Sequence, residues 1–328
     1  MMPTTNDALL SIRNLKKHFP VKKPGLFNSE KAVVKAVDGI SLDIYAGETI
    51  GIVGESGCGK TTAGRTFLKL IDPTDGQIIY KGQDISGFSS KQMRPLRAEM
   101  QIIFQDPYSA LNPRITVGKI IAAPFEIQGV EPVGGVKREV QNLMERVGLN
   151  PEHYNRYPHE FSGGQRQRIG IARAIALKPK FIVADEPVSA LDVSIQAQVI
   201  NLLEELKRED SITIAFIAHD LSVIQYISDR VVVMYLGKIM EIASSDTLYS
   251  HPHHPYTQAL LSAVPQADPR TERTRERIIL SGDLPSPINP PSGCVFSTRC
   301  PKAQQICHQS APELLSVGSS QVACHFPD

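Results

Sequence analysis

The chain has 328 residues, of which 41% are hydrophobic and 21% charged, and its 35 Lys and Arg residues nearly balance its 34 Asp and Glu residues. This length is enough for about two domains whose cores need no disulfides, and the composition excludes a disordered or fibrous chain. The near-zero net charge excludes a strong overall field that would attract nucleic acid or anionic lipid.

Short alternating segments in the first third predict strands at 9–15 (LLSIRNL), 33–37 (VVKAV) and 40–44 (ISLDI), which would form a small, partly antiparallel sheet. After the turn AGE, the apolar run TIGIV at 49–53 predicts a buried strand, and TTAGRTFLKLI at 61–71 has helical spacing. A strand, a glycine-rich loop and a helix therefore follow in the order that phosphate binding requires.

The next segment, from about 89 to 158, has a helical pattern, with candidates in TVGKIIAAPFEI and VKREVQNLMERVGL. We interpret it as a helical insert in an α/β core. The apolar runs FIVAD, ITIAFIA and RVVVMYL alternate with helical patterns, which predicts parallel crossover units and a doubly wound sheet.

Neither a signal peptide nor a membrane span of roughly 20 apolar residues is visible, so we expect cytosolic residence.

The loop GESGCGKT at 54–61 fits the pattern G-x-x-x-x-G-K-[ST]. Its glycines let backbone N–H groups surround phosphates at a helix N-terminus, and its position between strand and helix favours this over a simple tight turn. We expect Lys60 to reach the outer phosphates and Thr61 to ligate magnesium, with only a backbone amide from Cys58. The predicted phosphate-binding residues are Gly54, Ser56, Gly57, Cys58, Gly59, Lys60, Thr61 and Thr62.

Two further motifs carry chemistry. FIVADEP ends in two carboxylates, of which Asp185 could hold magnesium and Glu186 could polarise an attacking water. Alone they could equally be solvated or cap a helix, but the preceding phosphate loop favours nucleotide hydrolysis. In FSGGQRQRIGIARAIAL, Ser162, Gly163 and Gly164 open an amphipathic helix, which is either a plain helix cap or a second anion-binding end.

With GESGCGKT as Walker A, FIVADE as Walker B and FSGGQ as the signature, nearly the whole chain resembles the nucleotide-binding subunits of ABC transporters. The resemblance implies an α/β fold with an ABC-type P-loop ATPase core in residues 1–263. That core would carry an antiparallel β subdomain and a helical signature subdomain at about 89–165. ATP and Mg²⁺ are the implied cofactors.

The resemblance also implies roles for single residues. Phe19 in KKHF resembles the aromatic residue that stacks on adenine, and Asp192 in SALD matches the D-loop. Gln105 in FQDP resembles the glutamine that joins magnesium to the permease. His219 in IAFIAHD resembles the switch histidine that contacts the γ-phosphate and positions Glu186 and the water, although a lone histidine is more often structural.

In this family two subunits face each other head to tail, so that the P-loop of one and the signature of the other enclose one ATP. This arrangement would explain two phosphate-binding ends in one chain. The signature residues implied are Ser162, Gly163, Gly164 and Gln165, preceded by Phe161 where leucine is commoner. A second departure is the insert PVKKPGLFNSEK after Phe19.

The stretches HPHHPYTQALLSAVP and SGDLPSPINPPSGCVFSTRCP resemble the oligopeptide and dipeptide importers, and KKHFPVKK resembles their F-type ATPase subunit. This implies ATP-driven peptide import by a heterodimer with a D-type ATPase subunit. The other implied partners are two permeases and, indirectly, an extracytoplasmic binding protein, at the cytoplasmic face of the inner or plasma membrane.

Other functions stay open at this point. A nickel or glutathione importer would share these motifs, and so would an ABC ATPase acting on DNA or ribosomes. The single ATPase half and near-neutral charge disfavour nucleic acid. The histidines at 251, 253 and 254 are separated by prolines and are interpreted as a helix start, not as metal ligands.

Residues 264–328 are expected to form a linker and a small Cys-rich appendage. Cys294, Cys300, Cys307 and Cys324 lack C-x-x-C spacing, and in a reducing cytosol they are either thiolate ligands or inert small residues. Because tails of this importer type are similar to ones that carry a four-iron cluster, the resemblance predicts a [4Fe-4S] cluster in preference to Zn²⁺. Its role would be structural or redox-sensitive.

Overall fold

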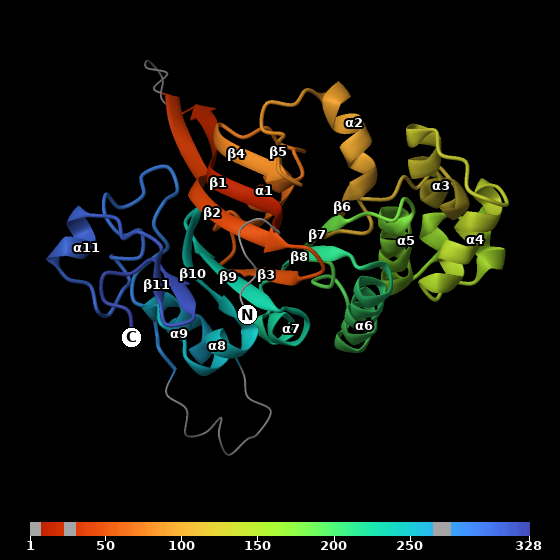
Figure 1. The fold of residues 1–328 in the computed structure, drawn as a ribbon. Helices are drawn as coiled ribbons and strands as arrows, with labels where there is room; N and C mark the ends of the chain where they lie inside the picture. Colours follow the sequence, from red (N-terminus) through yellow and green to blue (C-terminus); the bar gives the residue numbers. More distant parts are fainter. Residues whose placement is uncertain (1–7, 23–30, 265–276) are drawn as a thin grey trace. The chain divides into compact units, whose positions relative to one another are not determined.

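The computed structural model of the protein describes residues 8–22, 31–264 and 277–328. The chain packs as two compact units (Figure 1). Among described residues, the first unit comprises 44–48 and 87–217, and the second comprises 8–22, 31–43, 49–86, 218–264 and 277–328. Most of the predicted insert after Phe19 and most of the predicted linker lie outside the described residues, and the predicted domain boundary at residue 263 stays a prediction.

The first unit contains a parallel sheet of three short strands. Strand β7 (Phe181–Asp185) lies between β6 (Met100–Ile103) and β8 (Thr213–Ile217), with Phe181 opposite both Met100 and Thr213. Every residue of β7 and β8 is buried. Strands covered on both faces are apolar throughout, which is why FIVAD and ITIAFI show no alternation. The predicted parallel strands are confirmed here, but β6 lies inside the segment predicted to be helical.

Helices form the rest of the first unit. They are α2 (Ser90–Glu99), α3 (Val117–Gln128), α4 (Val136–Arg146), α5 (Gly163–Ile175) and α6 (Val193–Asp210), with the 3₁₀ turns η2 (Pro151–Asn155) and η3 (Pro158–Glu160). Figure 1 shows α3, α4 and α5 side by side, and all three contact one another. On α4 the buried residues Val140, Leu143 and Met144 recur at helical spacing, as the sequence predicts.

The second unit contains an antiparallel sheet in the order β2-β1-β4-β5. Its strands are β1 (Ala8–Lys22), β2 (Lys31–Tyr45), β4 (Asp75–Tyr80) and β5 (Gln83–Asp84). The two strands predicted at 33–37 and 40–44 are one strand, β2, which passes through Gly39 at a φ of 84°. The prediction of an antiparallel sheet in the first third is confirmed.

A second group of strands in this unit carries the phosphate loop. Strand β3 (Thr49–Val53) runs parallel to β9 (Arg230–Tyr235), β9 pairs with β10 (Lys238–Ser244), and β10 pairs with β12 (Ser320–Val322). Strand β11 (Leu315–Val317) completes the edge. The helices are α1 (Lys60–Phe67), α7 (Leu221–Ile227), α8 (Ser245–Ser250), α9 (Pro255–Ser262) and α11 (Gln305–Gln309). The C-terminal residues therefore extend this unit's own sheet.

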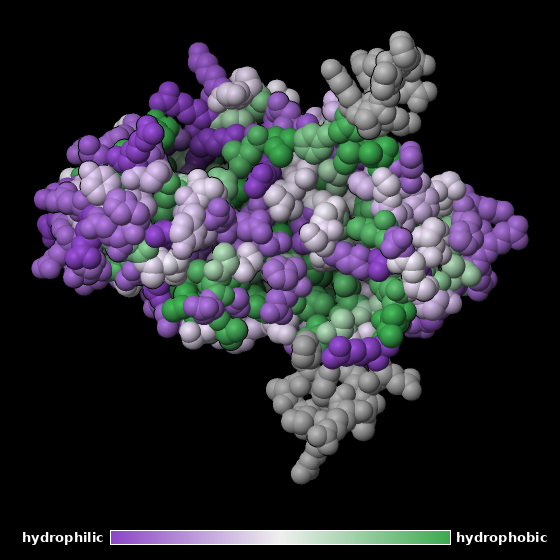
Figure 2. Space-filling model, turned by 180° about the vertical axis from the view of Figure 1, so that it is seen from behind, coloured by the Kyte–Doolittle hydropathy of each residue, from purple (hydrophilic) through white to green (hydrophobic). Residues whose placement is uncertain are grey.

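In the part of the chain that the structure describes, no helix combines the length and the hydropathy that crossing a bilayer requires. On the face drawn in Figure 2, hydrophobic residues reach the surface among hydrophilic ones. Such a mixture is usual for globular proteins and does not by itself mark a binding surface.

Candidate functional site

The phosphate loop joins the buried strand β3 to the start of α1 at Lys60. Two of its glycines permit close backbone approach. A Cβ atom on Gly54 would lie 2.1 Å from the carbonyl oxygen of Met234, and one on Gly59 would lie 2.0 Å from that of Ala36. Because Gly59 also has a φ of 107°, no other residue fits there without backbone displacement.

The side chain of Lys60 lies along the loop and is 5% exposed. Its Nζ donates to the carbonyl oxygen of Gly54 at 2.7 Å and to that of Glu55 at 3.0 Å. Cys58 is buried, and this burial raises the pKa of its thiol. Cys58 is therefore a neutral side chain, while Ser56 and Gly57 are exposed on the outer side of the loop.

Two other predicted residues belong to the same unit. The N–H of Ala218 donates to the carbonyl oxygen of Ile52 in β3 at 3.3 Å, so His219 emerges beside the strand end from which the loop starts. Phe19 is partly exposed on β1, with the Nζ of Lys17 4.9 Å from its ring centroid.

The predicted catalytic carboxylate lies in the other unit. Asp185 is fully buried at the carboxyl end of β7. Glu186 follows with a φ of 47°, a left-handed conformation that non-glycine residues adopt at an energetic cost and that is enriched at functional sites. The Nε2 of Gln105 donates to the Oε2 of Glu186 at 2.8 Å. The structure thus brings together Glu186 and Gln105, which are 81 residues apart.

The signature motif starts α5 with a capping box. The Ser162 hydroxyl accepts the N–H of Gln165 at 3.3 Å, and the Oε1 of Gln165 accepts the N–H of Ser162 at 3.0 Å. A Cβ on Gly164 would lie 2.4 Å from a methyl carbon of Ile195, so glycine permits close packing of α5 against α6. Gly163 leads this helix, and the exposed Asp192 immediately precedes α6.

Comparison with known proteins identifies the same family as the sequence motifs. A family model described as "ABC transporter" matches residues 37–189, and one described as "Oligopeptide/dipeptide transporter, C-terminal region" matches residues 240–307. Over 328 residues, the chain is 56% identical to the oligopeptide transport ATP-binding protein AppF of Bacillus subtilis, with 99% of each chain covered. The chain belongs to this ABC transporter family. The predicted family and fold class are confirmed, and the chain is an ATPase coupled to transport.

Other relatives agree. The oligopeptide transport ATP-binding protein OppF of Salmonella typhimurium is 52% identical, and the alignment covers 97% of this chain and 96% of OppF. Among solved structures, a dimeric post-hydrolysis state of the ATP-binding cassette MJ0796 bound to ADP and Pi has a TM-score of 0.64 and 26% identity, covering 72% of this chain and 98% of that one. The cbiO1 protein of Clostridium perfringens, part of the ABC transporter complex cbiONQ, has a TM-score of 0.63 and 26% identity, covering 75% and 92%.

The prediction of an iron-sulfur cluster in this ABC ATPase is wrong. Cys294, Cys300, Cys307 and Cys324 do line one cavity, but its volume is about 10 Å³, roughly the space of one water. Nowhere in residues 8–22, 31–264 and 277–328 do three or more His, Cys, Asp or Glu side chains form a group that could hold a metal ion. The zinc alternative fails on the same observation.

The physical reason is close packing, which leaves the four cysteine side chains a cavity too small for a cluster. Burial also raises the pKa of the Cys294 thiol to about 11 and raises the pKa values of Cys300 and Cys324, as expected for thiols packed among apolar groups. All five cysteines are free, so the four in the extension act as small packing residues.

His254 marks a helix start, as the sequence predicts for the histidines near 251. Its Nδ1 accepts the N–H of Tyr256 at 3.0 Å in the first turn of α9. The ring is 1% exposed, and burial lowers its pKa to about 4, so His254 is neutral and able to accept this bond.

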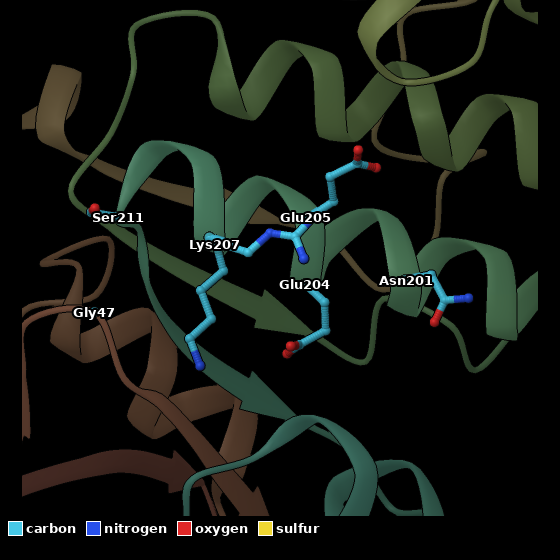
Figure 3. Close-up of a pocket in the computed structure, with 7 residues that line it drawn as sticks. Gly47, Asn201, Glu204, Glu205, Lys207 and Ser211 are labelled. Atoms are coloured by element: carbon cyan, nitrogen blue, oxygen red, sulfur yellow. The ribbon is translucent and has the colours of Figure 1, made fainter.

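A separate pocket of about 690 Å³ lies along the end of α6. Figure 3 shows Glu204 and Lys207 projecting to the same side of the helix and Glu205 to the other. Its lining residues are Gly47, Asn201, Glu204, Glu205, Lys207, Arg208 and Ser211. They carry charges of both signs and include none of the predicted site residues, so we interpret this pocket as a solvated charged groove.

One contact to the phosphate loop could not be predicted from sequence. The Nη1 of Arg299 lies 3.0 and 2.8 Å from the two carboxylate oxygens of Glu55. The two residues are 244 positions apart. Arg299 lies in the Cys-rich segment. The cysteine pattern there suggests metal binding, and no local pattern indicates a contact between this arginine and the phosphate loop.

Proposed function

We propose that this ABC ATPase powers the import of dipeptides and oligopeptides through an ABC permease. The observation that carries the proposal is the 56% identity to an oligopeptide transport ATP-binding protein over 99% of both chains. A protein of Brucella ovis described as a putative peptide import ATP-binding protein is 54% identical over 95% of this chain. The match to the transporter C-terminal region supports the same solute class.

The phosphate loop is assigned to the triphosphate of ATP. The backbone N–H groups of residues 54–62 surround the phosphates, and the ammonium of Lys60 offsets their charge. The glycines support this because side chains at Gly54 and Gly59 would collide with neighbouring carbonyls. Phe19, partly exposed on β1, is assigned to stacking on adenine.

Mg²⁺ is the proposed metal cofactor, with Thr61, Gln105 and Asp185 as its ligands. Hydroxyl, amide and carboxylate oxygens are the hard donors that this ion prefers. Bound Mg²⁺ would neutralise charge that develops on the transferred phosphate.

Glu186 is the proposed residue that polarises the attacking water. Its carboxylate is held by Gln105 at 2.8 Å, and its left-handed backbone turns the side chain away from the regular strand path. His219 is assigned to contact with the γ-phosphate. The proposed catalytic residues are therefore Glu186, Gln105 and His219.

The working assembly is proposed to be a head-to-tail dimer with a second, D-type ATPase subunit. In it Ser162, Gly163, Gly164, Gln165 and Asp192 of each subunit contact the ATP held by the partner. The solved structures of MJ0796, which are dimeric, support this arrangement. Two permeases anchor the dimer at the cytoplasmic face of the membrane, and a binding protein on the other face delivers peptide. Nucleic acid is not a proposed partner.

The hydrolysis assignment is tested with Glu186→Gln in the assembled transporter. Glutamine keeps the volume and can accept the hydrogen bond from Gln105, but it cannot polarise water. Turnover should fall about 100-fold or more while ATP stays bound. Glu131→Gln, at an exposed loop position, is the matched control and should turn over normally. Normal turnover in Glu186→Gln would contradict the assignment.

The transport assignment is tested by tagging this chain in its native membrane and identifying the proteins that co-purify. Two permeases, a different ATPase subunit and a peptide-binding protein are the expected result. A complex with a nickel or glutathione binding protein would refute the peptide assignment. Recovery of ribosomes or DNA would refute the import assignment while leaving the ATPase assignment intact.

A further inference from the structure

Glu55, the second residue of the phosphate loop, is held at three points. Its two carboxylate oxygens accept from Arg299 at 3.0 and 2.8 Å, and its N–H donates to the hydroxyl of Tyr256 at 3.0 Å. Its carbonyl oxygen accepts the Lys60 ammonium at 3.0 Å and the N–H of Cys58 at 3.2 Å. The position of this one residue therefore sets where the loop turns and where Lys60 lies.

The ion pair is more enclosed than an ordinary surface pair. The side chain of Arg299 is 11% exposed and that of Glu55 is 27% exposed. Burial opposes the charge on Arg299, but the hydrogen bonds to Glu55 and the charge of that carboxylate outweigh it and raise the pKa of Arg299. Charge-assisted bonds from one guanidinium nitrogen to both carboxylate oxygens are stronger than neutral ones and give the pair a defined geometry.

The protein provides a rigid support for Arg299. Phe296, three residues earlier, is fully buried, and its ring centroid lies 5.3 Å from that of Tyr235 and 5.2 Å from that of Tyr256. Tyr235 ends the strand that pairs with β3, and Tyr256 is the residue that bonds Glu55. One aromatic cluster thus connects the segment that carries Arg299 to the strand beside β3 and to Glu55 in the phosphate loop.

We propose that Arg299 of the C-terminal extension is a positioning residue for the nucleotide site, which acts through Glu55. A carboxylate in a phosphate-binding loop repels the triphosphate unless a cation neutralises it. Arg299 supplies that cation and holds the carboxylate in one position through bonds to both of its oxygens. The extension is then a working part of the ATP site within the same subunit.

This inference rests on the proposed binding of ATP at the loop, and the experiment separates the two. The full chain is purified and the dissociation constant of ATP is measured by displacement of a fluorescent ATP analogue. Arg299→Gln should weaken ATP binding about tenfold, the effect of losing one charge-assisted hydrogen-bonded contact. Arg299→Lys should restore part of the loss because it returns the charge without the guanidinium geometry.

A double-mutant cycle tests whether the effect passes through Glu55. In a Glu55→Gln background there is no carboxylate to neutralise, so adding Arg299→Gln should change the dissociation constant less than about twofold. Lys302→Gln is the matched control, since Lys302 is a cation of the same extension whose ion pair is with Asp328. In the assembled transporter, Arg299→Gln should raise KM for ATP and leave kcat nearly unchanged.

Each outcome decides one point. Equal losses for Arg299→Gln in both backgrounds would mean a purely structural role and would overturn the inference. Unchanged ATP binding in Arg299→Gln would also overturn it, while leaving the proposed function in place. Failure of the unmodified chain to bind ATP would overturn the proposed function together with the inference.

Discussion

Stability should depend on pH through His254, because its ring is buried in the neutral form. The usual pKa of 6.5 falls to about 4 in the folded chain, and the ring accepts the N–H of Tyr256 through Nδ1. The nearby charged groups are Glu241, which accepts the N–H of His254, and Lys302 and His325, which line the same cavity. Between these two pKa values the unfolded chain binds the proton more readily, so stability is lost as pH falls.

The size of the loss follows from the two pKa values. Linkage gives about 2 kcal/mol between about pH 7.5 and about pH 5, and on the order of 3 kcal/mol once the pH is below both values. His254→Asn offers a carbonyl oxygen to the N–H of Tyr256 but cannot be protonated. The variant should therefore lose less stability than the unmodified chain over the same range.

The assay is urea unfolding at both pH values, followed by circular dichroism because the chain has no tryptophan. Other carboxylates and histidines titrate equally in the two proteins, so the comparison isolates His254. Parallel losses in the two proteins, within about 0.5 kcal/mol, would refute the reasoning.

Two further predictions concern stability and use the same unfolding assay. Gly59→Ala should lower the free energy of unfolding by about 2 kcal/mol or more, because its Cβ would meet the Ala36 carbonyl, while Gly57→Ala should cost only about 1 kcal/mol for its positive φ. An equal cost for both would contradict the steric argument, since no described atom lies within 4 Å of a Cβ on Gly57. Phe296→Ala should cost about 3 to 5 kcal/mol, because the ring is fully buried among aromatic residues. Ile279→Ala, at a position 89% exposed, is its control, and a loss below about 1 kcal/mol for Phe296→Ala would argue against that packing.

Most features that could be predicted from the sequence are encoded by local patterns. The loop at 54–61 and the apolar strand that ends at Asp185 are contiguous motifs, so spacing alone identifies them. Strand β6 was missed because four residues are too few to show a period. The pairing of β10 with β12 is set by tertiary contacts that no local pattern encodes.

The cysteines show the limit of composition as a guide to function. Four thiols close in sequence are what a metal site needs, but such a site also needs space between them, and the packing around Phe296 and His254 leaves only about 10 Å³. Arg299 illustrates the same limit in the opposite direction. Its contact with Glu55 is visible only in three dimensions. In the sequence, Glu55 is part of the phosphate-loop motif and Arg299 is part of the Cys-rich segment, and neither pattern indicates that the two residues meet.

The ion pair between Glu55 and Arg299 also has a consequence for synthesis on the ribosome. Its partners are separated by 244 residues, so at about 5 to 20 residues per second the second emerges roughly 10 to 50 seconds after the first. The parallel neighbour of β3 is likewise made late, since β9 begins at Arg230. In the nascent chain the phosphate loop therefore lacks both β9 and the Arg299 cation at first, and it acquires its final surroundings only after residue 299 has been made.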